Sequence, residues 1–336
     1  MDATVDLRSD TVTRPTPAMR AAMADAEVGD DCYGEDPTVR RLEAMFAERV
    51  GAEAAMFVPS GTMANQVALR VLTRPGDMVV AGSRQHVVRF EAGAAGRNAG
   101  VQFHLVDDDD GTISPDDLGR VIEAGRHHQP DPVAVFVENT HLMAGGTIWP
   151  VERLDAVGAR HLPVHLDGAR LFHAEVATGI PAHRFVAPVT TVSCCLSKGL
   201  SAPVGSVLGG PAELIEAGRL ERKRFGGAMR QSGIIAAAGI VALERMVDRL
   251  TDDHAAARAL AEAVVARWPS ARLRVDDVRT NIVIFRHERT TALLEHLEAH
   301  GVRAGTVAPD TMRFVTHADV DADGVERAVA AIESAP

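Results

Sequence analysis

Residues 190–210 read "TTVSCCLSKGLSAPVGSVLGG", two apolar runs joined by a turn rich in glycine and serine. Lys198 is the only Lys, Arg, Asp or Glu between Arg184 and Glu213. Short apolar runs bounded by turn residues predict strands that are buried on both faces of a sheet. A single lysine therefore follows directly on a buried strand.

Five further runs upstream share these features: "AAMFVPSG", "DMVVAG", "VQFHLV", "PVAVFVEN" and "LPVHLDG". Helix signals lie between them, including Ser114 before Pro115, and Asp36 before a helix that Gly51 closes. Strands that alternate with helices predict an α/β fold with a mainly parallel sheet and helices on both faces. Ligands of such sheets bind at the carboxyl ends of the strands, which is where we expect Lys198.

The pattern changes after about residue 245. We expect a long helix over "DDHAAARALAEAVVARW", strands at "RLRV", "NIVIFR" and "MRFVTH", and helices from about Thr290 and from Asp319. This order predicts a compact α+β unit that follows the larger α/β unit.

The composition of the 336 residues is that of a soluble globular protein, with 46% hydrophobic and 24% charged residues. The net charge of −11 argues against a nucleic-acid binder, which needs clustered Lys and Arg. The longest apolar run, Ile234 to Leu243, predicts a buried helix because it is too short to span a bilayer. The charged start "MDATVDLRSDT" lacks the apolar centre of a signal peptide, so we expect a cytoplasmic protein.

The sequence shows no pattern of metal ligands. Cys32 stands alone, and Cys194 and Cys195 are adjacent, so neither a disulfide framework nor a zinc site is indicated. The run "VDDDDGTIS" lacks the alternating ligands of a calcium loop and predicts a solvated turn. We therefore predict no metal site.

Three residues at strand ends each have a chemical and a structural interpretation. Burial favours the neutral amine of Lys198, a nucleophile that forms imines with aldehydes, but a lysine can also extend to solvent. Asp167, at the end of "LPVHLDG", would either hold the ring nitrogen of pyridoxal phosphate protonated or cap a helix. Arg170 would either clamp a substrate carboxylate or form a surface ion pair.

Two further features lie after upstream strands. Ser60, Gly61 and Thr62 begin a helix, and backbone N–H groups at a helix N-terminus suit a phosphate, although these residues are common at any helix start. The P-loop and the G-x-G-x-x-G fingerprint are absent, which argues against nucleotide binding. His86, after "DMVVAG", would either stack on a cofactor and handle protons or be an ordinary loop residue.

Eight motifs make the chain resemble the L-threonine aldolases from about Asp6 to His317: "DLRSDTVTRPTPAM", "VGDDCYGEDPTV", "SGTMANQVAL", "VENTH", "HLDGAR", "CLSKGLSAPVGSVL", "GGAMRQSGI" and "RFVTH". The resemblance implies a pyridoxal-phosphate (PLP) enzyme with the aspartate aminotransferase type of fold, fold type I, which has a seven-stranded, mostly parallel sheet. It implies an N-terminal segment of residues 1–15 that contributes to the active site, a large PLP-binding domain of residues 16–245 and a small C-terminal α+β domain of residues 246–336.

The resemblance also implies residue roles. Lys198 would hold the cofactor aldehyde, Asp167 would pair with the pyridine nitrogen, and His86 would stack on the ring. The phosphate would be held by Ser60, Gly61 and Thr62, and the substrate carboxylate by Ser9, Arg170 and Arg313. A neighbouring subunit would complete the site through Arg230, which would reach the cofactor phosphate, and through Lys223 near it. The loop of Tyr33 would also line the site, and the resemblance implies a homotetramer made of two site-sharing dimers.

The implied activity is the cleavage of L-threonine, L-allo-threonine or a related β-hydroxy-α-amino acid to glycine and an aldehyde. The two arginines would select the Cα bond that breaks by fixing the carboxylate. A base must take the β-hydroxyl proton, and His86 and His128 are candidates, with the adjacent His127 as the alternative to His128.

Two departures from the family pattern leave the preferred substrate open. Arg89 stands where relatives tend to be apolar or aromatic, and "ENTHLMAGG" lacks the asparagine that often follows the histidine. Elimination, racemisation or transamination of a small L-amino acid on the same scaffold is the alternative reaction. A protein that only binds a metabolite is disfavoured, because it has no need of a lysine that forms imines.

Overall fold

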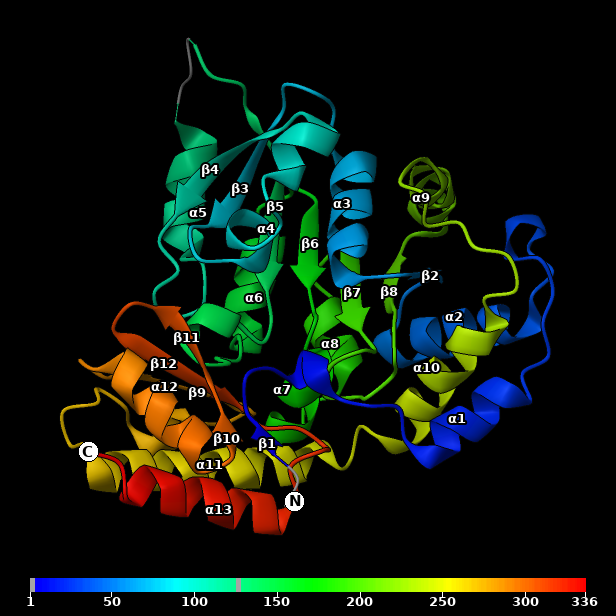
Figure 1. Ribbon diagram of the computed structural model, residues 1–336. Coiled ribbons are helices and arrows are strands. Elements are labelled where there is room, and N and C mark those ends of the chain that lie inside the picture. The colour runs from blue at the N-terminus through cyan, green and yellow to red at the C-terminus, as the bar shows by residue number, and fades with distance from the viewer. Residues whose placement is uncertain (1–3, 125–127) are drawn as a thin grey trace.

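The computed structural model describes residues 4–124 and 128–336, and its centre is a seven-stranded sheet (Figure 1). The strand order is β2-β8-β7-β6-β5-β3-β4, and β8 runs antiparallel to both of its neighbours. The strands are β2 (Ala54–Val58), β3 (Met78–Gly82), β4 (Gln102–Val106), β5 (Pro132–Glu138), β6 (Val164–Asp167), β7 (Thr191–Cys195) and β8 (Ser206–Gly210). All seven lie in the apolar runs that predict strands, and the mostly parallel α/β sheet is confirmed.

Burial on both faces was expected of every strand and is wrong for β4. Among the described strands this one pairs with β3 alone, at one edge of the sheet, and Gln102 and Leu105 are exposed. An edge strand has a neighbour on one side only, so part of it faces solvent.

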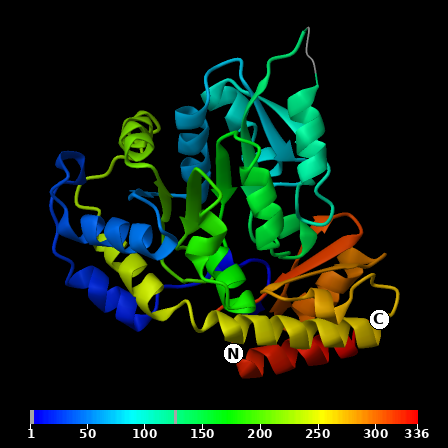
Figure 2. The same cartoon turned by 180° about the vertical axis from the view of Figure 1, so that it is seen from behind.

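Side chains that alternate along the strands pack into two separate hydrophobic layers. Met56 and Val79 face the layer with α3 and α9, whereas Phe57 and Val80 face the layer with α2, α6 and α10. Figure 2 shows this second layer from behind. The helices around the sheet are α1 (Pro17–Ala24), α2 (Pro37–Val50), α3 (Gly61–Leu72), α4 (His86–Arg89), α5 (Pro115–Glu123), α6 (Val151–Gly158), α7 (Leu171–Thr178), α8 (Ala182–Val186), α9 (Ala212–Arg224) and α10 (Gly233–Arg245).

The helix signals of the sequence are confirmed at their ends. Asp36 caps α2 by accepting from the amides of Thr38 and Val39, and Gly51 ends the helix with a φ of 70°. Ser114 caps α5 in the same way. The apolar run from Ile234 lies inside α10, whose residues are mostly buried.

The C-terminal part has its own sheet, of order β11-β12-β9, and its own hydrophobic cluster. Its elements are α11 (Leu250–Arg267), β9 (Ile282–Arg286), α12 (Thr290–Ala299), β10 (Val302–Arg303), β11 (Gly305–Ala308), β12 (Thr311–Val315) and α13 (Ala322–Glu333). The N-terminal strand β1 (Val5–Asp6) pairs with β10, so the start of the described chain joins the C-terminal part (Figure 1). The division at residues 15 and 245 remains a prediction.

Three local expectations are wrong. "RLRV" forms no strand, because Arg272 has a left-handed φ of 52° and a 3-10 helix begins at Val275. The last helix begins at Ala322 rather than Asp319, because Asp321 is the cap that accepts from the amide of Gly324. In the turn "VDDDDGTIS", Asp108 is buried and contacts His141 at 2.9 Å, so this aspartate is not solvated. Among the helices of residues 4–124 and 128–336, none is long and apolar enough to cross a membrane.

Candidate active site

Lys198 lies in the turn after β7, at the carboxyl end of the strand. Its carbonyl accepts from the Thr13 hydroxyl at 3.0 Å and from the Ser201 amide at 2.8 Å, so the turn is tied to the N-terminal segment. Ser201 adopts a left-handed φ of 63°, which is uncommon outside glycine. The Lys198 side chain is half-buried, and it forms no hydrogen bond or ion pair with any residue that the structure describes. Its amine is therefore available to a ligand.

Asp167 ends the neighbouring strand β6, between Glu138 of β5 and Ser193 of β7. Its buried carboxylate accepts from the Asn65 side-chain amide at 2.7 Å and from the Ala169 backbone amide at 3.1 Å. The cap position of α7 is occupied by Arg170, so Asp167 does not cap that helix.

Positive side chains keep this carboxylate ionised. Burial alone would raise the pKa of Asp167, but His86, Lys198 and the Asn65 hydrogen bond outweigh burial and hold the pKa below its ordinary value. An ionised carboxylate at this position suits a protonated heterocyclic nitrogen.

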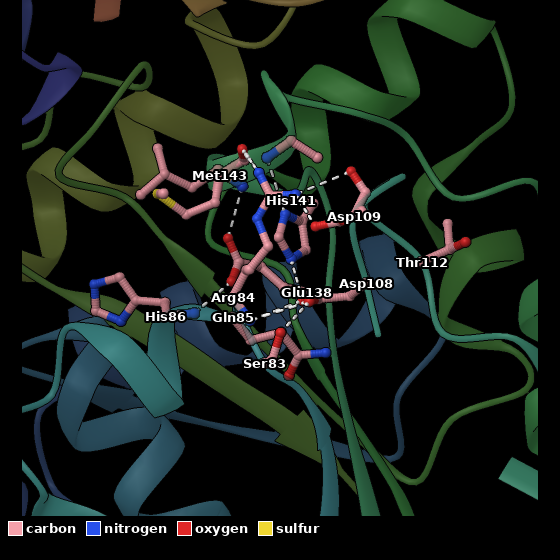
Figure 3. A network of polar contacts seen from close by, with 12 residues as sticks. Ser83, Arg84, Gln85, His86, Asp108, Asp109, Thr112, Glu138, His141 and Met143 are labelled. Carbon is pink, nitrogen blue, oxygen red and sulfur yellow. Dashed lines mark hydrogen bonds and ion pairs between the residues drawn. The ribbon is translucent and has the colours of Figure 1, made fainter. Parts of the chain in front are cut away.

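His86 is the first residue of α4 and is fixed at two points. Its backbone amide donates to Glu138 Oε2 at 2.6 Å (Figure 3), and its Nδ1 lies 3.1 Å from Glu91 Oε1. Burial would lower the pKa of His86, but the Glu91 hydrogen bond and the Asp167 charge raise it above its ordinary value. The structure thus places His86, Asp167 and Lys198 within electrostatic reach of one another.

A group of three possible metal ligands is found in the same place. Single ligand atoms of His86, Glu91 and Asp167 all lie within 4.8 Å of one another. Donors from Asn65 reach both carboxylates, at 2.8 and 2.7 Å. Hydrogen bonds of the protein itself therefore account for the close approach of these acidic groups.

The start of α3 forms a small polar cradle. Ser60 caps the helix by accepting from the Met63 amide, while the first-turn amides of Gly61 and Thr62 have no acceptor within the helix. A Cβ atom on Gly61 would come within 2.8 Å of Cys195 Sγ, so glycine allows the close contact. Ser206 Oγ, at the start of β8, is buried without a hydrogen-bond partner among the described residues. Unpartnered N–H and O–H donors around one glycine suit an anion such as phosphate.

Arg170 is buried and paired with Asp10 of the N-terminal segment. The Nε and Nη2 groups of Arg170 donate to the two carboxylate oxygens of Asp10, both at 2.7 Å. Burial alone would raise the pKa of Asp10, but this guanidinium holds it well below its ordinary value. The surface ion pair considered for Arg170 is therefore wrong. Ser9 is the cap of the adjacent 3-10 helix η1 (Asp10–Val12) and accepts from Thr11.

Arg313 of β12 brings a second guanidinium from the C-terminal part of the chain. Its Nη2 donates to the Arg8 carbonyl at 2.8 Å, and its Nε is buried without a partner among the described residues. Burial and the like charge of Arg170 lower the pKa of Arg313. An unpaired N–H beside a second positive charge suits a carboxylate.

His128 is not brought to these residues within one chain. It is exposed and lies just before β5, whereas Glu138 at the other end of that strand contacts His86. His127, its alternative, lies outside the described residues.

Tyr33, Lys223 and Arg230 form a second group, separate from Lys198. Tyr33 ends the 3-10 helix η2 (Asp31–Tyr33), is 78% exposed, and lines a cavity of about 410 Å³ together with Lys223. Arg230 is joined to the same loop by a hydrogen bond from the Asp31 amide to its carbonyl and by an ion pair with Asp30. The three residues thus gather on the surface of the chain.

Four buried polar residues at the site were not anticipated: Asp10, Asn65, Glu91 and Glu138. Asp10 and Glu138 lie inside motifs of the resemblance, but nothing in their spacing indicates their partners. Asn65 also lies in such a motif, and it and Gln66 are polar residues among the otherwise apolar buried residues of α3, which is the signal that indicates a buried hydrogen-bond network.

A buried histidine behind the site predicts acid sensitivity. His165 contacts Asn65 Oδ1 and Thr191 Oγ1, and burial lowers the pKa of His165 to about 4. An unfolded histidine titrates near 6.5, so below that pH the unfolded chain binds a proton that the folded chain does not. We expect the free energy of unfolding to fall by roughly 3 kcal/mol between about pH 6.5 and 4.

Urea unfolding of the wild type and of His165→Gln across this range checks the expectation. The variant lacks the titrating group, so its stability should depend less on pH. Equal pH dependence in the two proteins would contradict it.

Comparisons with known proteins agree with this geometry. Residues 6–288 match the model of the family described as beta-eliminating lyase. The chain is 46% identical over 288 residues to a probable low-specificity L-threonine aldolase 2 of Arabidopsis thaliana, covering 83% of this chain and 81% of that protein. It is 41% identical over 321 residues to a low specificity L-threonine aldolase of Escherichia coli K12, covering 94% of each. A solved structure of SPT with PLP has the same fold, with a TM-score of 0.79, 18% identity, and coverage of 99% of this chain and 87% of that one.

Proposed function

The chain belongs to the beta-eliminating lyase family, and we propose that it uses pyridoxal phosphate to cleave L-threonine, L-allo-threonine and related β-hydroxy-α-amino acids. The products are glycine and an aldehyde, which makes the protein a carbon–carbon lyase. The observation that carries this function is the convergence of the Lys198 amine, the Asp167 carboxylate and the His86 ring, which follow the carboxyl ends of β7, β6 and β3 in one sheet. Relatives at 41 and 46% identity bear the name low-specificity L-threonine aldolase.

The described residues fit the cofactor. The unpaired Lys198 amine suits its aldehyde, ionised Asp167 its ring nitrogen, and the donors of Gly61, Thr62 and Ser206 its phosphate. When bound, pyridoxal phosphate supplies an electron-accepting ring that stabilises the charge left at Cα by bond cleavage.

The two arginines bind and orient the substrate. Arg170 uses two of its donors on Asp10, which leaves Nη1 free for a carboxylate, and Arg313 offers its unpaired Nε. A carboxylate held by two guanidinium groups fixes the orientation of Cα, so these residues determine which bond is broken.

His86 is the proton-handling group that the geometry supports best. Its Nδ1 is committed to Glu91, so Nε2 is the nitrogen left to accept the β-hydroxyl proton. His128 is exposed before β5 and would reach a site only from a neighbouring subunit.

We also propose a homotetramer in the cytoplasm, with active sites shared between paired subunits. The exposed group of Tyr33, Lys223 and Arg230 supports the sharing, because these residues gather away from Lys198 of their own chain. Light scattering measures the oligomeric state.

The test of the function is a panel of β-hydroxy-α-amino acids, with aldehyde release coupled to an alcohol dehydrogenase and with glycine measured independently. Equal amounts of aldehyde and glycine are expected. Keto acid and ammonia in their place would show elimination, the alternative reaction of this scaffold, and no product from any amino acid would refute the proposal.

Removal of the Ser206 hydroxyl should weaken cofactor binding without lowering the stability of the apoenzyme. The hydroxyl is buried and has no hydrogen-bond partner in the part of the chain that the structure describes, so Ser206→Ala should leave the melting temperature of the apoenzyme unchanged or raised. A hydrogen bond to a charged group contributes about 1.5–3 kcal/mol, so we expect the PLP dissociation constant to rise roughly tenfold or more. Fluorescence titration of the apoenzyme measures this constant, and an unchanged value would place the phosphate elsewhere.

A further inference from the structure

Glu91 is a buried carboxylate with no role in the proposed function so far, and it contacts the site residue His86. Its side chain is fully buried and accepts three side-chain hydrogen bonds, from Asn65 at 2.8 Å, Gln66 at 2.7 Å and His86 at 3.1 Å. A buried charge is costly unless it is fully hydrogen-bonded, so this carboxylate needs all three donors.

Asn65 joins Glu91 to Asp167. One Asn65 amide nitrogen donates to Glu91 Oε1 at 2.8 Å and to Asp167 Oδ2 at 2.7 Å, which uses both of its N–H groups. The amide oxygen accepts from the Ser193 hydroxyl and from the His165 ring. The orientation of Asn65 is therefore fixed, and the two carboxylates are held at a set separation.

The contact with Glu91 also determines which nitrogen of His86 carries a proton. An ionised carboxylate only accepts hydrogen bonds, so His86 Nδ1 must be the protonated nitrogen of the neutral ring. Glu138 fixes the same residue through its backbone, because its Oε2 accepts from the His86 amide (Figure 3). Glu138 fixes the position of the His86 backbone, whereas Glu91 fixes the orientation of the His86 ring.

We propose that Glu91 is a positioning residue of the active site, which orients the His86 ring and keeps the proton on its Nδ1. Asn65 holds the Glu91 carboxylate close to that of Asp167. This inference rests on the proposed function. In this arrangement the Nδ1 of His86 is hydrogen-bonded to Glu91, and Nε2 is the nitrogen that reacts. A carboxylate orients a catalytic histidine in the same way in other enzymes.

The charges around His86 give the direction of the expected effect. The groups that face it are Glu91, Asp167 and Lys198, with Glu138 at its backbone. Glu91 and Asp167 stabilise the protonated ring and Lys198 destabilises it. Removal of the Glu91 charge therefore lowers the pKa of His86, and the acidic limb of kcat/KM should move to lower pH.

The test compares Glu91→Gln with Glu91→Asp in the PLP-loaded enzyme. For Glu91→Gln we expect a fall in kcat of roughly tenfold to a hundredfold and an acidic limb at lower pH. Glu91→Asp keeps the charge, so its acidic limb should stay close to that of the wild type even if kcat falls. An unshifted limb in Glu91→Gln would overturn the proposal.

A second measurement does not depend on activity. The PLP dissociation constant of the apoenzyme should rise several-fold in Glu91→Gln, because the His86 ring that stacks on the cofactor loses the contact that orients it. In a His86→Phe background, Glu91→Gln should have little further effect on this constant. Full additivity of the two substitutions would show that Glu91 acts independently of His86.

Glu175→Gln is the matched control. Glu175 is a hydrogen-bonded carboxylate in α7 that pairs with Arg49 at 2.6 Å and accepts from the Ala182 amide. Its substitution should lower stability without moving the pH profile, and a shift equal to that of Glu91→Gln would overturn the proposal. Failure of the proposed function appears separately, as a wild type that releases no aldehyde.

Discussion

Lys198→Ala is expected to abolish aldehyde release, with a fall in kcat of roughly a thousandfold or more. Losses of this size follow the removal of groups that form covalent bonds or transfer protons. The half-buried Lys198 amine has no partner among the described residues and lies beside Asp167, whose negative charge it stabilises. Alanine offers no amine to the cofactor aldehyde. The visible absorbance of the lysine-bound cofactor should disappear together with the activity.

The sequence makes this test unusually clean, because Lys198 and Lys223 are its two lysines. Borohydride reduction fixes the cofactor to the lysine that holds it, so peptide mapping has two possible outcomes. Lys223→Ala is the matched control and should retain the label at Lys198. A label found at Lys223, or a Lys198→Ala variant that cleaves threonine at the wild-type rate, would contradict the assignment.

The sheet could be predicted from the sequence because each strand is recorded locally. Runs such as "DMVVAG" and "PVAVFVEN" are continuously apolar and bounded by turn residues. A strand inside the sheet is buried on both faces, so its side chains must be apolar on both sides. Whether a strand lies at the edge of the sheet cannot be predicted from its own residues, because it depends on which other strands pair with it. The run "VQFHLV" looks similar in the sequence, yet β4 lies at the edge because no strand of the described residues pairs with its other side.

The positions of Lys198 and Asp167 could be predicted for a related reason. In a parallel sheet, residues that follow neighbouring strands meet at one edge even when they lie far apart in the chain. The partners of these residues could not be predicted. Asp10 meets Arg170 across 160 residues and Asn65 meets Asp167 across 102, and no spacing rule links them.

Buried polar residues were the least predictable part of the site. Asp108 stands in a run of four aspartates, where solvation is the ordinary outcome, but it turns inward to the Ser83 hydroxyl and the Arg84 amide. Glu91 sits beside the exposed Phe90 and carries no local sign of burial. Such residues are fixed by the donors that the fold supplies, and only the assembled structure shows those donors.

Arg170→Lys is expected to lower kcat/KM by roughly a hundredfold or more, mainly through a higher KM for the amino acid. The planar guanidinium donates to both oxygens of Asp10 and still has Nη1 for the substrate carboxylate. A lysine ammonium is a point charge at the end of a flexible chain, so it can pair with Asp10 or approach the substrate but cannot repeat both contacts.

The buried pair also gives this substitution a cost in stability. Asp10 is fully buried, and a buried carboxylate that loses part of its pairing destabilises the folded chain, by up to about 3–5 kcal/mol when a partner is removed altogether. Arg184→Lys is the matched control, since Arg184 pairs through two nitrogens with Asp155 on the surface. That variant should change neither KM nor stability appreciably. If Arg170→Lys bound and cleaved threonine as the control does, the substrate carboxylate would be recognised by Arg313 without Arg170, and the Asp10 pair would be structural only.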